Sequence, residues 1–79
     1  MNKIKVEVTL KENIMDPQGL AVMKALQNLK VSGIKDVRIG KIFFLTFEKN
    51  VPDDKVIEDF CDKLLSNPVI ENFKIIKTD

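Results

Sequence analysis

The order in which two hydrophobic periodicities alternate along the chain most constrains its fold. Apolar residues recur at every second position over residues 4–10, at helical spacing over 17–31, and at every second position again over 36–39, which a strand-like segment apolar on both faces follows at 42–47. A second helical pattern over 52–66 and a third alternating pattern over 69–76 follow. A period of two is typical of strands and a period of 3.6 is typical of helices. Because Gly40 and Lys41 divide the middle segment into two strands, the sequence predicts the order strand, helix, strand, strand, helix, strand.

Cap and stop residues define the two helices. Asp16 can cap the first helix and Pro17 can occupy its first position, while the Ser-Gly pair at 32–33 supplies a stop. The apolar side of the second helix is formed by Val56, Ile57, Phe60, Cys61 and Leu64. Both helices are thus amphipathic and are expected to cover a sheet.

The middle of the chain predicts a hairpin. Gly40 and Lys41 separate an alternating segment over 36–39 from the apolar segment 42–47, so these two segments are expected to pair antiparallel. With right-handed crossovers, the whole chain, residues 1–79, would form one α+β domain of the ferredoxin-like βαββαβ type. Its two layers would be a four-stranded antiparallel sheet and two helices on one face.

Size and charge restrict the possible partners. A single domain of 79 residues has a small core, so that oligomerisation often supplies part of its stability. Thirteen basic and twelve acidic residues leave a net charge of +1, which disfavours nonspecific binding to nucleic acid or to an anionic membrane. With one cysteine, no signal peptide and no apolar run long enough for a membrane span, we expect a soluble cytoplasmic protein.

The composition offers little for catalysis. The chain has no histidine, and its one cysteine, Cys61, lies on the apolar side of the second helix, where a buried structural thiol is expected. Glu58, Asp59 and Asp62 form an acidic group on the second helix. Lys55 and Lys63 lie four residues to either side of Asp59, which is the spacing of surface ion pairs on a helix. None of the glycines belongs to a phosphate-binding loop. We therefore expect no catalytic residue, no metal site and no cofactor of the chain's own.

One predicted strand carries apolar residues on both of its faces. Phe43, Leu45 and Phe47 would face the core, whereas Ile42 and Phe44 would lie on the opposite face, which a two-layer domain leaves uncovered. Isolated apolar residues are common on protein surfaces, so exposure alone is one explanation. Burial in a subunit contact is the other, and it predicts a homodimer or a tetramer.

Three strings carry a resemblance to a known family. They are VTLKENIMDPQG at 8–19, DVRIGK at 36–41 and LLSNPVIENF at 64–73. In this order and spacing the sequence, from about residue 3 to 77, resembles the PurS subunits of phosphoribosylformylglycinamidine synthase. The resemblance implies a small non-catalytic subunit of purine biosynthesis. A PurS dimer would bridge the glutaminase subunit, PurQ, and the ATP-dependent synthetase subunit, PurL, and would help to keep ammonia from escaping between their active sites.

The residues that match the family's pattern are candidates for partner contact or for turns. They are Asp16, Pro17, Gln18, Gly19, Arg38, Gly40 and Lys41. Ile42 and Phe44 join them as candidates on the outward strand face. The amides at the helix start could hold an anion, although capping by Asp16 itself would satisfy them. Arg38 could grip a partner's carboxylate or carbonyl groups, or it could form a surface ion pair with Glu48 or another acid.

Two alternatives remain open from the sequence. The segment 41–47 distantly echoes the aromatic strand of ferredoxin-like RNA-binding domains, but it lacks their glycine and aromatic order. The same fold can also host a regulatory small-ligand domain. The sequence does not decide between a dimer and a tetramer, nor which surface would meet which large subunit.

Overall fold

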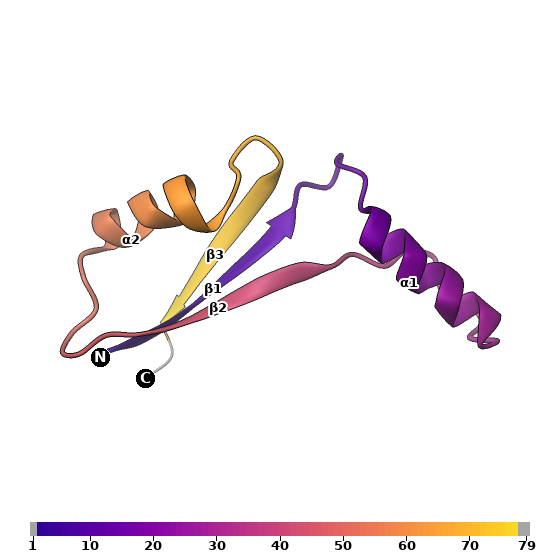
Figure 1. Ribbon diagram of the computed structural model, residues 1–79, viewed down its shortest axis with the longest axis horizontal. Coiled ribbons are helices and arrows are strands. Elements are labelled where there is room, and N and C mark those ends of the chain that lie inside the picture. Colours follow the sequence, from indigo (N-terminus) through magenta and orange to yellow (C-terminus); the bar gives the residue numbers. More distant parts are fainter. Residues whose placement is uncertain (1, 78–79) are drawn as a thin grey trace.

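A computed structural model describes residues 2–77 and contains three strands and two helices (Figure 1). In chain order the elements are β1 (Lys3–Leu10), α1 (Pro17–Asn28), β2 (Gly40–Thr46), α2 (Asp54–Phe60), the π-helical turn η1 (Cys61–Leu65) and β3 (Glu71–Lys77). The strands form one antiparallel sheet in the order β2-β1-β3. The prediction of an α+β domain is confirmed.

The central strand β1 supplies most of the core. Ile4, Val6 and Val8 are almost completely buried, as the alternating pattern predicts for a strand with one dry face. On that face Val6 lies opposite Phe43 of β2 and opposite Ile75 of β3. The pairing register therefore brings the apolar residues of all three strands to the same side of the sheet.

α2 and η1 cover this inner face (Figure 1). Ile57 and Cys61 are fully buried against β1. The partly buried residues packed around them are Phe43, Leu45, Phe47, Val51, Phe60, Leu65, Phe73 and Ile75. Five side chains between residues 2 and 77 are fully buried, which makes a small core, and cores of this kind supply only ~3–5 kcal/mol.

The π-helical turn changes which leucine reaches the core. The Ser66 N–H donates to the Cys61 carbonyl at 3.0 Å, a bond to the fifth residue back that widens the helix. As a result Leu65 packs against the core, whereas Leu64 is 78% exposed. Val56 is 50% exposed as well, so the expectation that Val56 and Leu64 share the buried side of this helix is wrong.

The predicted hairpin and the fourth strand are wrong. Residues 34–39 form no strand, and β2 begins at Gly40, which pairs directly with Thr9 of β1. A Cβ at Gly40 would lie 2.6 Å from the Val8 carbonyl oxygen, so glycine permits this close approach to β1. The Ile39 N–H is not free for a strand partner because it donates to the Asp16 carboxylate at 2.7 Å. The sheet consequently has three strands, and the ferredoxin-like plan is not completed.

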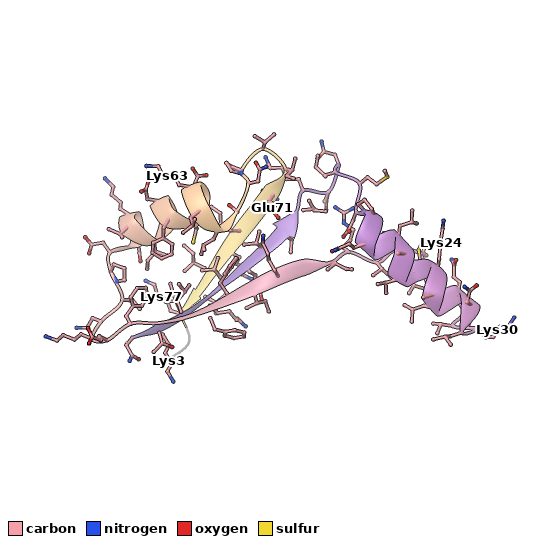
Figure 2. The ribbon with its side chains drawn as sticks, in the orientation of Figure 1. Lys3, Lys24, Lys30, Lys63, Glu71 and Lys77 are labelled. Atoms are coloured by element: carbon pink, nitrogen blue, oxygen red, sulfur yellow. The ribbon has the colours of Figure 1, made fainter. Side chains whose placement is uncertain are left out.

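α1 does not cover the sheet of its own chain, contrary to the expectation of two helices on one face. It extends beyond the end of the sheet, and the segment that follows it runs back beside it to β2 (Figure 1). Lys24 and Lys30 accordingly lie at the end of the molecule opposite Lys3 and Lys77 (Figure 2). We call α1 and the returning segment 29–39 the α1 arm.

The arm helix starts as predicted and ends earlier. Asp16 is its N-cap and Pro17 its first residue. The helix ends at Asn28, before the predicted Ser-Gly stop, because Lys30 adopts the left-handed conformation with a φ of 68°. The Lys30 and Val31 amides then donate to the carbonyls of Gln27 and Leu26, the two bonds of a Schellman motif.

The arm makes the molecule unusually extended for its size. The radius of gyration is 16.0 Å, whereas a compact chain of this length has about 12 Å. The accessible surface is 6068 Å², whereas a folded monomer of this mass exposes about 4,900 Å². Roughly 1,200 Å² of surface per chain is thus in excess of what a compact monomer would show.

Candidate functional site

Most of the candidate contact residues meet where the α1 arm joins the sheet. A hollow of about 310 Å³ lies there, which we call the junction hollow. It is lined by Val8, Leu10, Asp16, Pro17, Gln18, Ile39, Gly40, Lys41 and Glu71. The structure therefore brings residues of the string at 8–19 next to residues of the string at 36–41, with Glu71 of the string at 64–73 beside them.

Asp16 is the most constrained polar residue of the junction. Its side chain is buried, its Oδ1 accepts the Gly19 N–H at 2.9 Å, and its Oδ2 accepts the Ile39 N–H at 2.7 Å. These bonds, with that of Ile39 the strongest, hold the pKa of the Asp16 carboxyl below its usual range, with the charge of Arg38 acting in the same direction. The prediction that Asp16 caps the helix is confirmed. Because the Asp16 carboxylate already binds these amides, an anion could bind them only by displacing the carboxylate.

Arg38 makes a contact within its own chain. It is exposed, and its Nη2 donates to the Lys11 carbonyl at 2.9 Å, which ties the returning segment to the loop after β1. Among the described residues 2–77 its guanidinium forms no ion pair with Glu48 or another acid. The remaining donors of the guanidinium are available to a partner.

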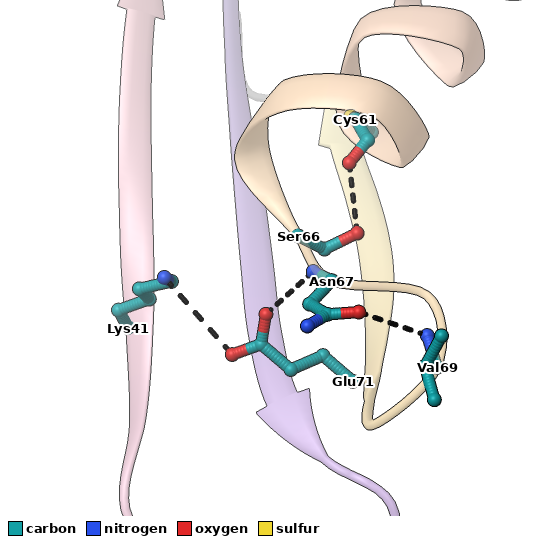
Figure 3. Close-up of polar contacts among 6 residues, drawn as sticks. All are labelled: Lys41, Cys61, Ser66, Asn67, Val69 and Glu71. Atoms are coloured by element: carbon teal, nitrogen blue, oxygen red, sulfur yellow. Dashed lines mark hydrogen bonds and ion pairs between the residues drawn. The ribbon is translucent and has the colours of Figure 1, made fainter.

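Glu71 and Lys41 close the junction hollow from the sheet side. Glu71 accepts the Asn67 N–H at 2.7 Å, and its other oxygen lies 4.0 Å from the Lys41 Nζ (Figure 3). The Asn67 side chain in turn accepts the Val69 N–H at 3.1 Å, so two side-chain hydrogen bonds hold this turn before β3. The Lys41 ammonium also lies 5.7 Å from the centre of the Phe43 ring.

Glu71 is the functional candidate that the sequence analysis missed. Its four-residue spacing from Asn67, at the predicted helix end, was the available signal, since a carboxylate placed there can satisfy a free amide of the turn. Its position in the hollow depends on the pairing of β3 with β1, which places Glu71 opposite Leu10.

Ile42 and Phe44 lie apart from the hollow, on the face of the sheet opposite α2. We call this the outer face, and it carries Lys5, Glu7, Ile42, Phe44, Lys74 and Ile76. Phe44 is 78% exposed and Ile42 is 49% exposed. The prediction that β2 is apolar on both faces is therefore confirmed. On the central strand β1 the Lys5 Nζ lies 3.9 Å from the Glu7 Oε2. The outer face therefore combines apolar side chains with an ion pair of opposite charges.

The described part of the chain shows no arrangement suited to metal or nucleophilic chemistry. Within residues 2–77 no three or more Cys, Asp or Glu side chains cluster in a way that could hold a metal ion. Cys61 is fully buried, and burial, with a contribution from the Glu58 charge, raises the pKa of its thiol. Its thiolate is therefore disfavoured. Among the described helices none is long and apolar enough to cross a membrane.

Comparisons with known proteins agree on one family. The family model described as "PurS: Phosphoribosylformylglycinamidine (FGAM) synthase" matches residues 3–79. The phosphoribosylformylglycinamidine synthase subunit PurS of Bacillus subtilis is 48% identical over 75 residues, which cover 94% of this chain and 89% of the relative. The PurS subunit of Mycobacterium leprae is 42% identical over 77 residues, covering 98% and 96%.

Solved structures give the same result. A crystal structure of B. subtilis PurS superimposes with a TM-score of 0.84 at 47% identity, with 95% of each chain covered. A chain of the Thermotoga maritima PurLQS structure superimposes with a TM-score of 0.80 at 26% identity, covering 98% of this chain and 96% of that one. The agreement includes the extended arm, because nearly the whole chain is matched. This chain belongs to the PurS family, the PurS subunits of phosphoribosylformylglycinamidine synthase.

Proposed function

We propose that this chain is a non-catalytic, oligomeric bridge between the glutaminase subunit, PurQ, and the synthetase subunit, PurL, and that it supports the transfer of ammonia between them. The observation that carries this proposal is the large apolar surface outside the chain's own core. A related PurS chain belongs to the T. maritima PurLQS structure, which supports a place in such an assembly. Neither the RNA-binding nor the small-ligand alternative has comparable support.

Two exposed surfaces favour a homo-oligomer. On the α1 arm the exposed apolar residues are Leu20, Val22, Leu29 and Val31, with exposed fractions from 40% to 75%. On the outer face they are Ile42 and Phe44. The excess surface of roughly 1,200 Å² per chain is enough for one standard interface on each copy, since such interfaces bury about 800 Å² per partner.

A small core gives a second, energetic reason. The arm is held to the rest of the chain by its two connections and a few hydrogen bonds, and only Gly19 of α1 is buried. Helices of this length are marginal in water unless an apolar face is covered. A second copy of the chain that covers the α1 arm would therefore stabilise both the helix and the dimer or tetramer.

The proposed contact with the large subunits involves the junction. Arg38, Gln18 and Lys41 present polar groups next to exposed apolar surface, a combination typical of the rim of a protein interface. Among the described residues the one thiol, that of Cys61, is buried, and no group of acidic and cysteine side chains could hold a metal ion. The chain would then contribute to turnover by holding the glutaminase and the synthetase in a fixed arrangement.

A reconstitution experiment tests this function. The chain is mixed with PurQ and PurL, and amidine synthesis is measured with glutamine and, separately, with free ammonia as the nitrogen source. We expect omission of the chain to reduce glutamine-dependent synthesis strongly, while ammonia-dependent synthesis continues because ammonia from solution needs no bridge. Equal rates with and without the chain on glutamine would refute the proposal.

A variant refines the test. Arg38→Glu should lower co-purification and glutamine-dependent synthesis, because a reversed charge cannot bind a partner's carboxylate or carbonyl groups. Lys35→Glu, at another exposed position of the same segment, is the control for net charge. If both variants behave alike, Arg38 is not a specific contact.

A further inference from the structure

The junction between the α1 arm and the sheet is built more tightly than a simple connection requires. The chain leaves the sheet through residues 11–16 and returns through residues 34–39. These two stretches are the covalent links between the arm and the body (Figure 1). Side-chain contacts at this point therefore decide in which direction the arm projects.

Asp16 joins three parts of the chain. One carboxylate oxygen caps α1 through the Gly19 N–H, and the other binds the Ile39 N–H on the returning segment, 23 residues away in the sequence. We call these two bonds the Asp16 clasp. A helix cap needs only the first bond. The second bond, at 2.7 Å the shorter of the two, fixes the start of the helix against the residue that enters β2.

Gly19 holds the two backbones in contact. A Cβ at position 19 would lie 2.0 Å from the Val37 carbonyl oxygen, a distance that no side chain could occupy without moving the segment. The Arg38 bond to the Lys11 carbonyl adds a further tie between the outgoing and returning stretches. Two hydrogen-bonded bridges, Asp16 to Ile39 and Arg38 to Lys11, thus join the outgoing and returning stretches at the base of the arm, and the Gly19–Val37 contact packs α1 against the returning segment.

We propose that Asp16 is a positioning residue for subunit assembly, because its clasp sets the direction of the α1 arm relative to the sheet before a partner is met. The inference rests on the proposed oligomer. Without the bond to Ile39, the arm would turn about its two connections, and only a fraction of the molecules would present the arm correctly. The apparent dissociation constant then rises at least in inverse proportion to that fraction, and in inverse proportion to its square where both copies must present the arm.

Asp16→Ser separates the clasp from simple capping. Serine is a good N-cap, so its hydroxyl replaces the bond to Gly19, but a single short hydroxyl cannot also reach Ile39. Asp36→Ser removes an exposed carboxylate from the returning segment and controls for charge and composition. Gly19→Ala is the second test, since it displaces the segment without altering the carboxylate.

Two measurements are made on each full-length variant. Amide hydrogen exchange compares the Ile39 amide with amides of β1, and light scattering or sedimentation over a dilution series gives the dissociation constant of the oligomer. For Asp16→Ser and Gly19→Ala we expect faster exchange at Ile39 with β1 unchanged, and association weakened about tenfold or more. We expect Asp36→Ser to match the unmodified chain in both.

The outcomes separate the two proposals. If the unmodified chain is monomeric at all concentrations, the proposed oligomer is wrong and the inference falls with it. If the unmodified chain associates and Asp16→Ser associates equally well, the oligomer stands and Asp16 is only a cap. If Asp16→Ser loses protection throughout β1, Gly19→Ala decides, and normal association in that variant overturns the inference.

Discussion

Phe43 and Phe44 are adjacent residues on β2. Truncation of Phe44 should weaken association between chains, whereas truncation of Phe43 should destabilise the fold of the chain itself. Phe44 lies on the outer face, 78% exposed, whereas Phe43 packs partly buried against the core on the inner face. Under the proposed assembly, Phe44→Ala removes apolar area that is covered only by a partner. Phe43→Ala removes area that is covered by the chain itself.

The magnitude follows from the exposed area. With 78% of a phenylalanine surface of about 200 Å² available, burial at ~25 cal/mol per Å² gives an upper limit near 4 kcal/mol. Because a partner covers only part of this area, we expect Phe44→Ala to weaken association by about 2–3 kcal/mol, roughly a 30- to 150-fold increase in the dissociation constant. Its cost to the isolated fold should be at most about 1 kcal/mol, the range of strand propensities.

The assay measures association and folding separately. Light scattering over a dilution series reports the dissociation constant, and denaturant unfolding followed by far-UV circular dichroism reports stability, since the chain has no tryptophan or tyrosine for intrinsic fluorescence. The matched control, Phe43→Ala, should lower the unfolding free energy by about 2–3 kcal/mol, less than a fully buried phenylalanine would. If Phe44→Ala unfolds as easily as Phe43→Ala, or if its association is unchanged, then the outer face is not an interface.

Three further predictions concern single residues. Cys61→Ala should cost about 1–2 kcal/mol of stability and leave turnover per assembled complex unchanged. In the unmodified chain the Cys61 thiol should resist alkylation until the chain unfolds, because the thiol is buried and its pKa is raised. Lys30→Gly should stabilise the chain by up to about 1 kcal/mol, because glycine adopts the left-handed conformation without strain. At a fixed chain concentration the thermal unfolding midpoint of this variant should be higher than that of the unmodified chain. An unchanged or lower midpoint would contradict this reasoning. The pKa of Asp16 is lower in the folded state, so the clasp should contribute stability above the unfolded-state pKa of about 3.9, and this contribution should be lost as the pH falls through the folded value. Asp16→Ser should remove this acid dependence at the Ile39 amide, and its persistence in hydrogen exchange would assign it to another group.

The sequence alone determined the local elements. Alternation over 4–10 sufficed for β1 because a strand that buries one face needs an apolar residue at every second position. Asp16 and Pro17 sufficed for the start of α1 because capping depends on the helix's own first turn. Two-sided apolar character sufficed to predict that β2 has apolar side chains outside the core, at Ile42 and Phe44. Each of these follows from interactions between near neighbours in the chain.

The tertiary structure alone decided where these elements lie. Residues 36–39 alternate like a strand, but alternation cannot show that the Ile39 N–H is taken by a carboxylate 23 residues away, which leaves this segment beside α1 instead of in the sheet. The amphipathic pattern of α1 likewise predicts that the helix is covered, but not by which sheet, since one apolar stripe fits its own chain or a partner equally well. The Asp16 clasp, the junction hollow and the arm are therefore long-range features. They depend on which backbone groups meet in space, and no local pattern specifies that.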